Sequence, residues 1–518
     1  MNSSANLILP ILCLLPGAIS AQQGYSHRID GAGSSSRLGR SLSVCSDNAL
    51  QPDGLPDIVT TNYSEILWWS VSGPSPQLTD AITGLYSLLD GTISGFELDG
   101  DQWDELFVPT SSGAASKPDY VYSGAYPHTV LSTWYGENNA FPVGDIDSDG
   151  TPDLATFDGS NLRIRSGASL AGTIVLISDQ DLGYACAPLG DVNMDGYADF
   201  AATGPSIATG SLKAFAGGSV ASAGALLWTF YAQNPSDRLE ALVNVGDWDG
   251  DGYSDLAVGS PGYDYASLSN SGRIYVVSGV SGAEIVHLEG FAAGLAMGAE
   301  RRLAAGDLTG DGQAELIVGL PGYDPGGAAS AGAVRVYEWD GVQLNLIRGF
   351  DGSSGGDQFG YRVAFGNDMD GDGISDFIAS SPYADTSVGN DSGSVFVFPG
   401  ISAGAPVLSA PQIASPGQVL PVSVSNAPIG SHVVLLGGPS AGGSLILGHV
   451  FDIGTPHYVL AAGGPTGISG TVGLSLPIPN PFPRALPFNL KLEAMVIDPG
   501  GMPFSSVLST NLTSTVIQ

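Results

Sequence analysis

The sequence predicts an all-β chain in which a seven-bladed β-propeller is followed by a C-terminal β-sandwich. An acidic, glycine-rich loop recurs seven times with a period of roughly 46 to 61 residues, and such a period is typical of propellers and solenoids. Short runs of alternating aromatic and β-branched residues, most of them ending in glycine, lie around the loops and indicate strands. Glycine supplies 74 of 518 residues, as expected for many tight turns.

Each repeat contains the strands of one propeller blade. One strand precedes the acidic loop, an apolar strand follows it, a third strand ends in glycine, and an outer strand leads to the next repeat. The seventh repeat ends at "VFVFPG" and lacks an outer strand, whereas Tyr25 to Asp30 resembles the outer strand that precedes that repeat. We therefore predict that Tyr25 to Asp30 closes the ring, because this pairing would remove two exposed sheet edges.

The last repeat, "FGYRVAFGNDMDGDGISDFIASSPYADTSVGNDSGSVFVF", resembles the FG-GAP repeat of integrin α-subunit propellers, and the resemblance extends over about Tyr25 to Gly400. The Phe-Gly pair is intact at Phe359-Gly360 and becomes "LG" or "MG" in other copies. This resemblance implies a propeller whose acidic loops are β-hairpins. It also implies, by analogy with integrin ligand binding, a module for binding or adhesion.

The acidic loops are predicted to bind Ca²⁺, which prefers six to eight hard oxygen ligands in flexible geometry. Carboxylates at loop positions 1, 3, 5 and 9, a main-chain carbonyl at 7 and a glycine at 6 can surround one ion. An acidic turn that binds no metal is the alternative, and five near-complete copies argue against it. The predicted ligands are Asp145, Asp147, Asp149, Asp153; Asp191, Asn193, Asp195, Asp199; Asp247, Asp249, Asp251, Asp255; Asp307, Thr309, Asp311, Glu315; and Asp368, Asp370, Asp372, Asp376.

Two further copies depart from this pattern. Glu97, Asp99, Asp101 and Glu105 form a weaker sixth site that lacks the glycine. The first copy has Ala49 and Gln51 at positions 1 and 3, so we predict no ordinary site there.

Composition and termini indicate an exported chain. Residues 1–21 have an apolar core and small residues near the end, as in a signal peptide. The formal net charge of −35, with 16 Lys and Arg, disfavours nucleic acid and anionic membranes as partners, and no apolar run is long enough for an integral membrane span. We expect the propeller over 22–400, a linker over 401–407 and the β-sandwich over 408–518. The C-terminal segment is similar to modules on large secreted bacterial proteins, and attachment, sorting and capping all stay open as its role.

The leading hypothesis is a secreted or cell-surface, calcium-stabilised binding module that recognises an extracellular protein or a polysaccharide. The alternative is a lectin-like or polysaccharide-degrading propeller enzyme, although no acid/base constellation stands out and "GPSAG" lacks the strand-turn-helix context of a catalytic serine. Blades five to seven have longer loops between their second and third strands. We predict that these loops form a ligand face opposite the calcium loops, with Tyr263, Tyr265, Tyr323 and Tyr383 on it. The alternative is that the loops are packed and self-contained, with their tyrosine rings buried against their own blades.

Overall fold

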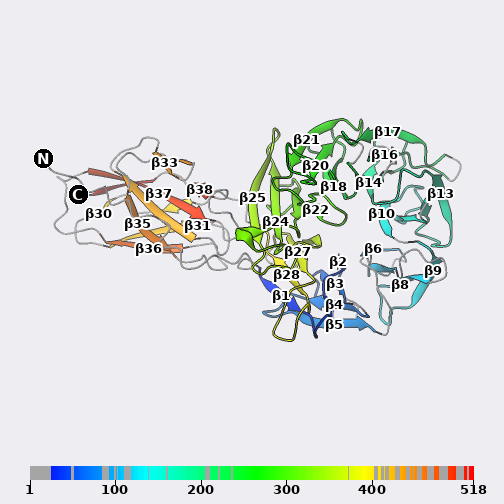
Figure 1. The fold of residues 1–518 in the computed structure, drawn as a ribbon, viewed down its shortest axis with the longest axis horizontal. Coiled ribbons are helices and arrows are strands. Elements are labelled where there is room, and N and C mark those ends of the chain that lie inside the picture. The colour runs from blue at the N-terminus through cyan, green and yellow to red at the C-terminus, as the bar shows by residue number, and fades with distance from the viewer. Residues whose placement is uncertain are drawn as a thin grey trace.

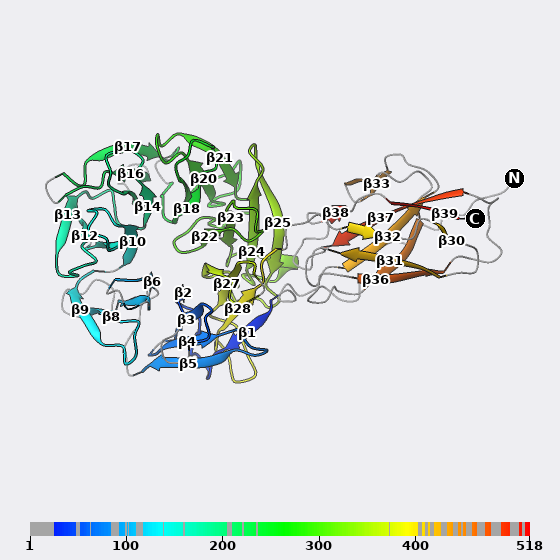
Figure 2. The same ribbon diagram turned by 180° about the vertical axis from the view of Figure 1, so that it is seen from behind.

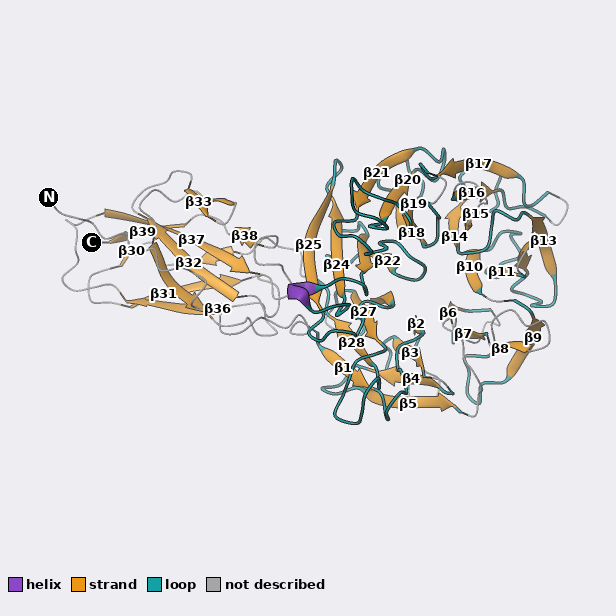
Figure 3. Ribbon diagram, in the orientation of Figure 1, coloured by secondary structure: helices purple, strands orange, loops and turns teal. Residues whose placement is uncertain are grey.

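The computed structural model shows a closed ring of seven four-stranded antiparallel sheets, followed by a separate group of strands (Figures 1 and 2). Almost all of the ordered secondary structure is β, and the short 3₁₀ turn η2 (Pro325–Gly327) is the purple element in Figure 3. Beyond residue 401 the structure describes only strands. Before it, the described residues are 25–401 with gaps at 48–51, 63, 84–92, 99–100, 102, 110–117, 138, 159–160, 205–209, 220–221, 235–236 and 372. The predicted signal peptide, residues 1–21, lies outside them.

Six blades use four consecutive strands each, which confirms the predicted repeat. Blades one to three are β2 (Leu42–Cys45), β3 (Asp57–Thr61), β4 (Ile66–Ser70), β5 (Gln77–Ile82); β6 (Ile93–Phe96), β7 (Glu105–Val108), β8 (Pro118–Tyr122), β9 (Val130–Tyr135); and β10 (Ala140–Gly144), β11 (Asp153–Phe157), β12 (Asn161–Arg165), β13 (Thr173–Ser178). Blades four to six are β14 (Cys186–Gly190), β15 (Asp199–Gly204), β16 (Ser211–Phe215), β17 (Leu226–Tyr231); β18 (Leu242–Gly246), β19 (Asp255–Ser260), β20 (Arg273–Val277), β21 (Glu284–Glu289); and β22 (Leu303–Gly306), β23 (Glu315–Gly319), β24 (Ala333–Trp339), β25 (Leu344–Asp351).

The seventh blade is completed by the N-terminus, as predicted. It contains β26 (Val363–Asn367), β27 (Asp376–Ser381) and β28 (Ser394–Phe398), and its outer strand is β1 (His27–Asp30). β1 runs antiparallel to β28, with His27 opposite Val397 and Asp30 opposite Ser394. The ring is therefore closed by backbone hydrogen bonds between the two ends of the propeller sequence.

The core lies between blades and is made mainly by the second and third strands. Every residue of β19, β20, β27 and β28 is buried. In blade seven, Phe377 and Phe398 stack with ring centroids 4.8 Å apart, and Phe350 of blade six lies 4.4 Å from Phe398. Both faces of these strands pack against neighbouring blades. Strands that are buried on both faces need apolar side chains at nearly every position, which explains the apolar run that follows each acidic loop.

A β-bulge lies near the end of the inner strand in blades three, four, five and seven, and blade two has a similar register shift between Ile93 and Phe96. The register between strands one and two shifts before Gly144, Gly190, Gly246 and Asn367. The three glycines have positive φ values of 83°, 75° and 74°, a conformation that glycine adopts readily. The bulge directs the chain out of the sheet and into the acidic loop.

The C-terminal strands form two larger sheets and a hairpin. One sheet is β29 (Val407–Ser409), β31 (Val419–Ser425) and β36 (Val472–Pro477). The other has the order β30 (Ile413–Ala414), β39 (Thr513–Ile517), β37 (Phe488–Ile497), β32 (His432–Gly438), β35 (Tyr458–Gly463), with β38 (Val507–Ser509) also paired to β37; β33 (Ser444–Ile446) and β34 (His449–Phe451) form the hairpin. The β-sandwich over 408–518 stays a prediction.

Candidate metal sites

The acidic loops share one hydrogen-bonded frame at the end of each inner strand. In five copies, the carboxylate at position 1 accepts a hydrogen bond from the backbone N–H of the glycine at position 6, over 2.8–2.9 Å. That glycine has a positive φ of 88° to 95° in all five, which confirms the predicted bend. The pairs are Asp145–Gly150, Asp191–Gly196, Asp247–Gly252, Asp307–Gly312 and Asp368–Gly373.

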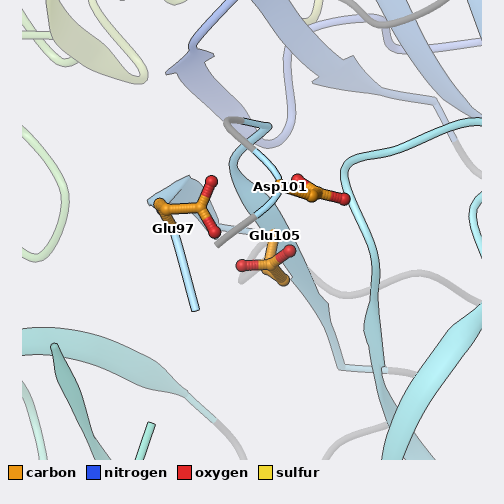
Figure 4. Close-up of side chains that lie close together, drawn as sticks. All are labelled: Glu97, Asp101 and Glu105. Carbon is orange, nitrogen blue, oxygen red and sulfur yellow. The ribbon is translucent and has the colours of Figure 1, made fainter. Parts of the chain in front are cut away.

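Four loops bring three carboxylates within reach of one cation. In each group the oxygen atoms lie within 4.8 Å of one another. The groups are Glu97, Asp101 and Glu105; Asp145, Asp147 and Asp153; Asp247, Asp249 and Asp251; and Asp368, Asp370 and Asp376. Figure 4 shows Glu97, Asp101 and Glu105 lying close together around the second loop. The predicted ligands Asp99 and Asp372 lie outside the described residues.

The other two loops use a neutral side chain at position 3. Asn193 Oδ1 accepts a hydrogen bond from the Asp195 N–H (2.8 Å), and the Thr309 hydroxyl donates to Glu315 Oε1 (3.4 Å). At position 5 of the Asp307 loop, Asp311 Oδ1 accepts the N–H of position 7. Asp149 Oδ1 accepts the N–H of position 7 in the same way in the fully acidic Asp145 loop. The frame is thus the same, with fewer charges around the centre.

The carboxylate at position 9 fastens the loop to the third strand of its blade. Asp255 is fully buried, and its Oδ2 accepts the N–H groups of Trp248 (2.8 Å) and Asp249 (3.1 Å). Its Oδ1 accepts the N–H of Gly279, 3.1 Å away, just after β20. Asp153, Asp199 and Asp376 make the same two-sided contact, to Gly167, Gly217 and Gly400. We call this contact the clasp; it was not foreseen from the sequence, although the glycine that ends each third strand is its signal.

Burial of the position-9 carboxylates raises their pKa values. Burial is the largest cause at Asp153 and Glu315, whose pKa values rise to about 7, and at Asp255, whose pKa rises to about 6. Burial also raises the pKa of Asp147, and the neighbouring Asp149 and Asp145 add to this effect. A bound cation favours the ionised form and offsets both desolvation and repulsion. The donor set therefore fits a hard divalent cation such as Ca²⁺.

In the first copy, the residue at loop position 1 differs from the one that the sequence spacing predicts. Asp47, two residues before the expected Ala49, accepts the N–H of Gly54, which is the contact that position 1 makes elsewhere. Asp53 at position 5 accepts hydrogen bonds from the Ser70 and Ser72 hydroxyls (2.7 and 2.6 Å). Hydrogen bonds from serines therefore hold this loop, and Ala49 and Gln51 lie outside the described residues.

Two of the four tyrosines predicted for the ligand face turn inward. Tyr263 and Tyr323 are each only 8% exposed. The Arg273 guanidinium lies 3.9 Å from the Tyr263 ring centroid and hydrogen-bonds its hydroxyl, and Arg335 lies 5.3 Å from the Tyr323 centroid. Tyr383 is partly buried beneath Arg37 (4.9 Å), whereas Tyr265 is 44% exposed. Three of the rings thus stabilise their loops, and only Tyr265 is available on the surface.

The fold and loops define a β-propeller with acidic hairpin loops. The FG-GAP repeat model matches residues 242–277, 301–337 and 359–398, within blades five, six and seven. Blades five, six and seven of the propeller therefore contain FG-GAP repeats. No helix among the described residues is long and apolar enough to cross a membrane.

Curated relatives match parts of the chain. Phosphatidylinositol-glycan-specific phospholipase D of Bos taurus is 26% identical over 267 residues, covering 50% of this chain and 25% of the relative. The Mus musculus protein of that name is 31% identical over 165 residues (29% and 19%). Integrin alpha-V of Gallus gallus is 28% identical over 226 residues (40% and 21%). The chain spans a quarter or less of the length of each of these three relatives.

Proposed function

We propose that the propeller is a calcium-stabilised, non-catalytic binding module that is exported or displayed at the cell surface, where it recognises an extracellular protein or a polysaccharide. The observation that carries the calcium part is the repeated frame of position-1 carboxylate, glycine bend and buried clasp. Extracellular calcium modules bind at about 10⁻⁴–10⁻³ M. At 100 times this dissociation constant, each site adds about 2.7 kcal/mol to the free energy of unfolding, so several sites together rival the stability of a whole domain.

Metal removal tests the calcium part. EDTA should lower the melting midpoint and increase protease sensitivity, and added Ca²⁺ should restore both, whereas Mg²⁺ at the same concentration should restore less because it demands stricter geometry. Elemental analysis should find several Ca²⁺ ions per chain. A chain that carries no Ca²⁺ after dialysis against millimolar Ca²⁺ would contradict the proposal.

The binding part is supported by apolar side chains on loops of the face opposite the acidic loops. Tyr265, Phe291 and Val388 are 44%, 46% and 52% exposed. They lie between β19 and β20, between β21 and β22, and between β27 and β28, which all emerge at that face. Phe291 packs edge-on against Tyr323, with centroids 5.4 Å apart, so its position is fixed by the blade. Exposed apolar groups on rigid loops are typical of binding surfaces.

Arrays of glycans and of extracellular matrix proteins test this face with the purified chain. For any ligand found, a Tyr265→Ala, Phe291→Ala, Val388→Ala variant should lose most of the affinity and keep the melting midpoint. The matched control replaces Leu176 and Leu226 with alanine, because these are equally exposed (53% and 57%) but lie on the outer strands. Equal loss in both variants would place the binding surface elsewhere.

A further inference from the structure

Two adjacent cavities lie among the inner strands around the centre of the propeller. The first, which we call the mouth cavity, has a volume of about 170 Å³ and lies where the inner strands begin, at the end away from the acidic loops. The second, the channel cavity, has a volume of about 410 Å³ and lies along the middle of the inner strands. Leu242, Leu303 and Val363 line both, so the two cavities are adjacent along the inner strands.

The mouth cavity carries a concentration of arginine. Arg301 and Arg362 line it, and Arg302 lies between them in the sequence and next to Arg362 in space. Arg301 Nη2 donates to Asn139 Oδ1 of blade three, 2.9 Å away, and so reaches across the ring from blade six. Arg362 Nη1 donates to the Glu300 carbonyl (3.3 Å), which holds its guanidinium at the rim.

Two glutamates only partly balance these charges. Glu300 Oε1 lies 3.4 Å from both Arg301 Nε and Asn139 Nδ2. Glu240 forms its own ion pair with Arg238 (3.2 Å). Of the charged residues that line the mouth cavity, two are arginines, Arg301 and Arg362, and one is a glutamate, Glu300, in a chain whose formal net charge is −35.

Arg302 shows the effect of this excess. Burial and then the neighbouring Arg362 lower the pKa of its guanidinium, despite the presence of Glu240 and Glu300. Its Nε is buried and has no hydrogen-bond partner among the described residues. A cleft with excess charge of one sign concentrates ions of the opposite sign.

The channel below the mouth is apolar and lined by small side chains. Its walls include Ala187, Ala304, Ala305 and Ala364, with Phe365 at one side. The short alanine side chains leave the space open, and their methyl groups make it apolar. A ligand that fits both cavities must therefore combine an anionic head with a hydrocarbon chain.

We propose that the mouth and channel cavities form a binding site for a free aliphatic carboxylate. The carboxylate lies against Arg301 and Arg362, because guanidinium groups bind carboxylates through paired hydrogen bonds. The hydrocarbon chain extends into the channel past Leu242, Leu303 and Val363. This site lies at a different place from the acidic loops and makes no use of the exposed side chains Tyr265, Phe291 and Val388.

A series of sodium carboxylates tests the proposal on the full chain with Ca²⁺ present and ionic strength held constant. Acetate, butyrate, hexanoate and octanoate are titrated calorimetrically. Burial of each methylene adds about 0.8 kcal/mol, so affinity should rise about fourfold per methylene until the channel is filled. Hexylamine, which has the same chain and the opposite charge, should not bind.

Four substitutions assign the two halves of the site. Arg362→Gln should weaken hexanoate binding about tenfold or more, since a hydrogen bond to a charged group contributes about 1.5–3 kcal/mol. Arg163→Gln serves as the matched control, because Arg163 is a part-buried, ion-paired arginine on the third strand of blade three and does not line either cavity. Glu300→Gln should tighten binding, because it removes a like charge. Ala305→Leu should abolish the gain from longer chains and leave acetate binding unchanged.

Three results would overturn the proposal, provided that each variant melts as a folded protein. The first is hexanoate binding no tighter than acetate binding. The second is the same affinity for hexanoate in Arg362→Gln and Arg163→Gln. The third is an acidic peptide that binds at the mouth while free hexanoate does not, which would assign the arginines to a protein partner instead.

Discussion

In the acidic loop of blade five, stability measurements should distinguish the residue that forms the clasp from a residue that is predicted only to bind metal. In Asp255→Ala, the buried N–H groups of Trp248 and Gly279 lose their acceptor. Each unsatisfied buried N–H costs about 1–3 kcal/mol, so the free energy of unfolding should fall by about 2–5 kcal/mol even without calcium. Asp251 is exposed and accepts hydrogen bonds only from within its loop, such as the Tyr253 N–H. Asp251→Ala should therefore cost less than about 1 kcal/mol in EDTA.

Calcium increases the loss in both variants by the same amount. At 100 times the dissociation constant, wild type gains about 2.7 kcal/mol from this site, and both variants forfeit that gain. Urea unfolding in EDTA and in Ca²⁺ measures both terms, and Trp248 inside the loop provides a fluorescence signal. Asp255→Asn is the matched control, since it keeps one acceptor oxygen and should lose less than Asp255→Ala. Equal losses for Asp251→Ala and Asp255→Ala in EDTA would refute the clasp.

Three further predictions follow from contacts elsewhere in the ring. Deletion of residues 22–32 removes β1 and should lower the melting midpoint by about 5 °C or more; an unchanged midpoint would contradict closure by this strand. Burial and the nearby Asp385 raise the pKa of Asp357 to about 6, so the folded state favours the protonated carboxyl. The stability that this protonation adds is fully present below about pH 4 and is lost as the pH rises through 6. Asp357→Asn should accordingly stabilise the chain at pH 7.5 by about 1–2 kcal/mol and flatten the pH profile between 4 and 6; a variant that is less stable at both pH values would refute this. His128 joins blades two and one through a contact with Asp80 (2.8 Å) and a ring stack on Trp68 (4.6 Å between centroids). His128→Ala should therefore lower the free energy of unfolding by about 2 kcal/mol. A decrease no larger than that caused by alanine at the exposed His287 would contradict this prediction.

The sequence made the ring predictable because its acidic loops mark the same turn in every blade. The spacing of position 1 to position 6 also located the carboxylate–glycine contact that shapes five of the loops. The same counting failed in the first copy, where a longer loop puts Asp47 in the place assigned to Ala49. A fixed spacing cannot detect such an insertion, because only the folded turn shows which carboxylate meets Gly54.

The clasp and the buried tyrosines were beyond the reach of local patterns for a related reason. Gly279 lies 24 residues after Asp255, and Arg273 lies 10 residues after Tyr263. Strand pairing alone brings these groups together. Exposed and inward-facing tyrosines look the same in sequence. The arginines that cover Tyr263 and Tyr323 come from the strand that follows each loop, whereas Arg37, which covers Tyr383, lies between β1 and β2.

The pairing of β1 with β28 determines the order in which the propeller can fold during synthesis. The Ser394 hydroxyl reaches Asp30 across 364 residues of sequence. Within the propeller, the segment that is synthesised before all the others is thus the last to find its partner. Contacts of such long range slow folding. Until blade seven emerges, β1 is an unpaired strand and blade one has no neighbour on one side, so any truncated product leaves two open sheet edges for chaperones and proteases to recognise.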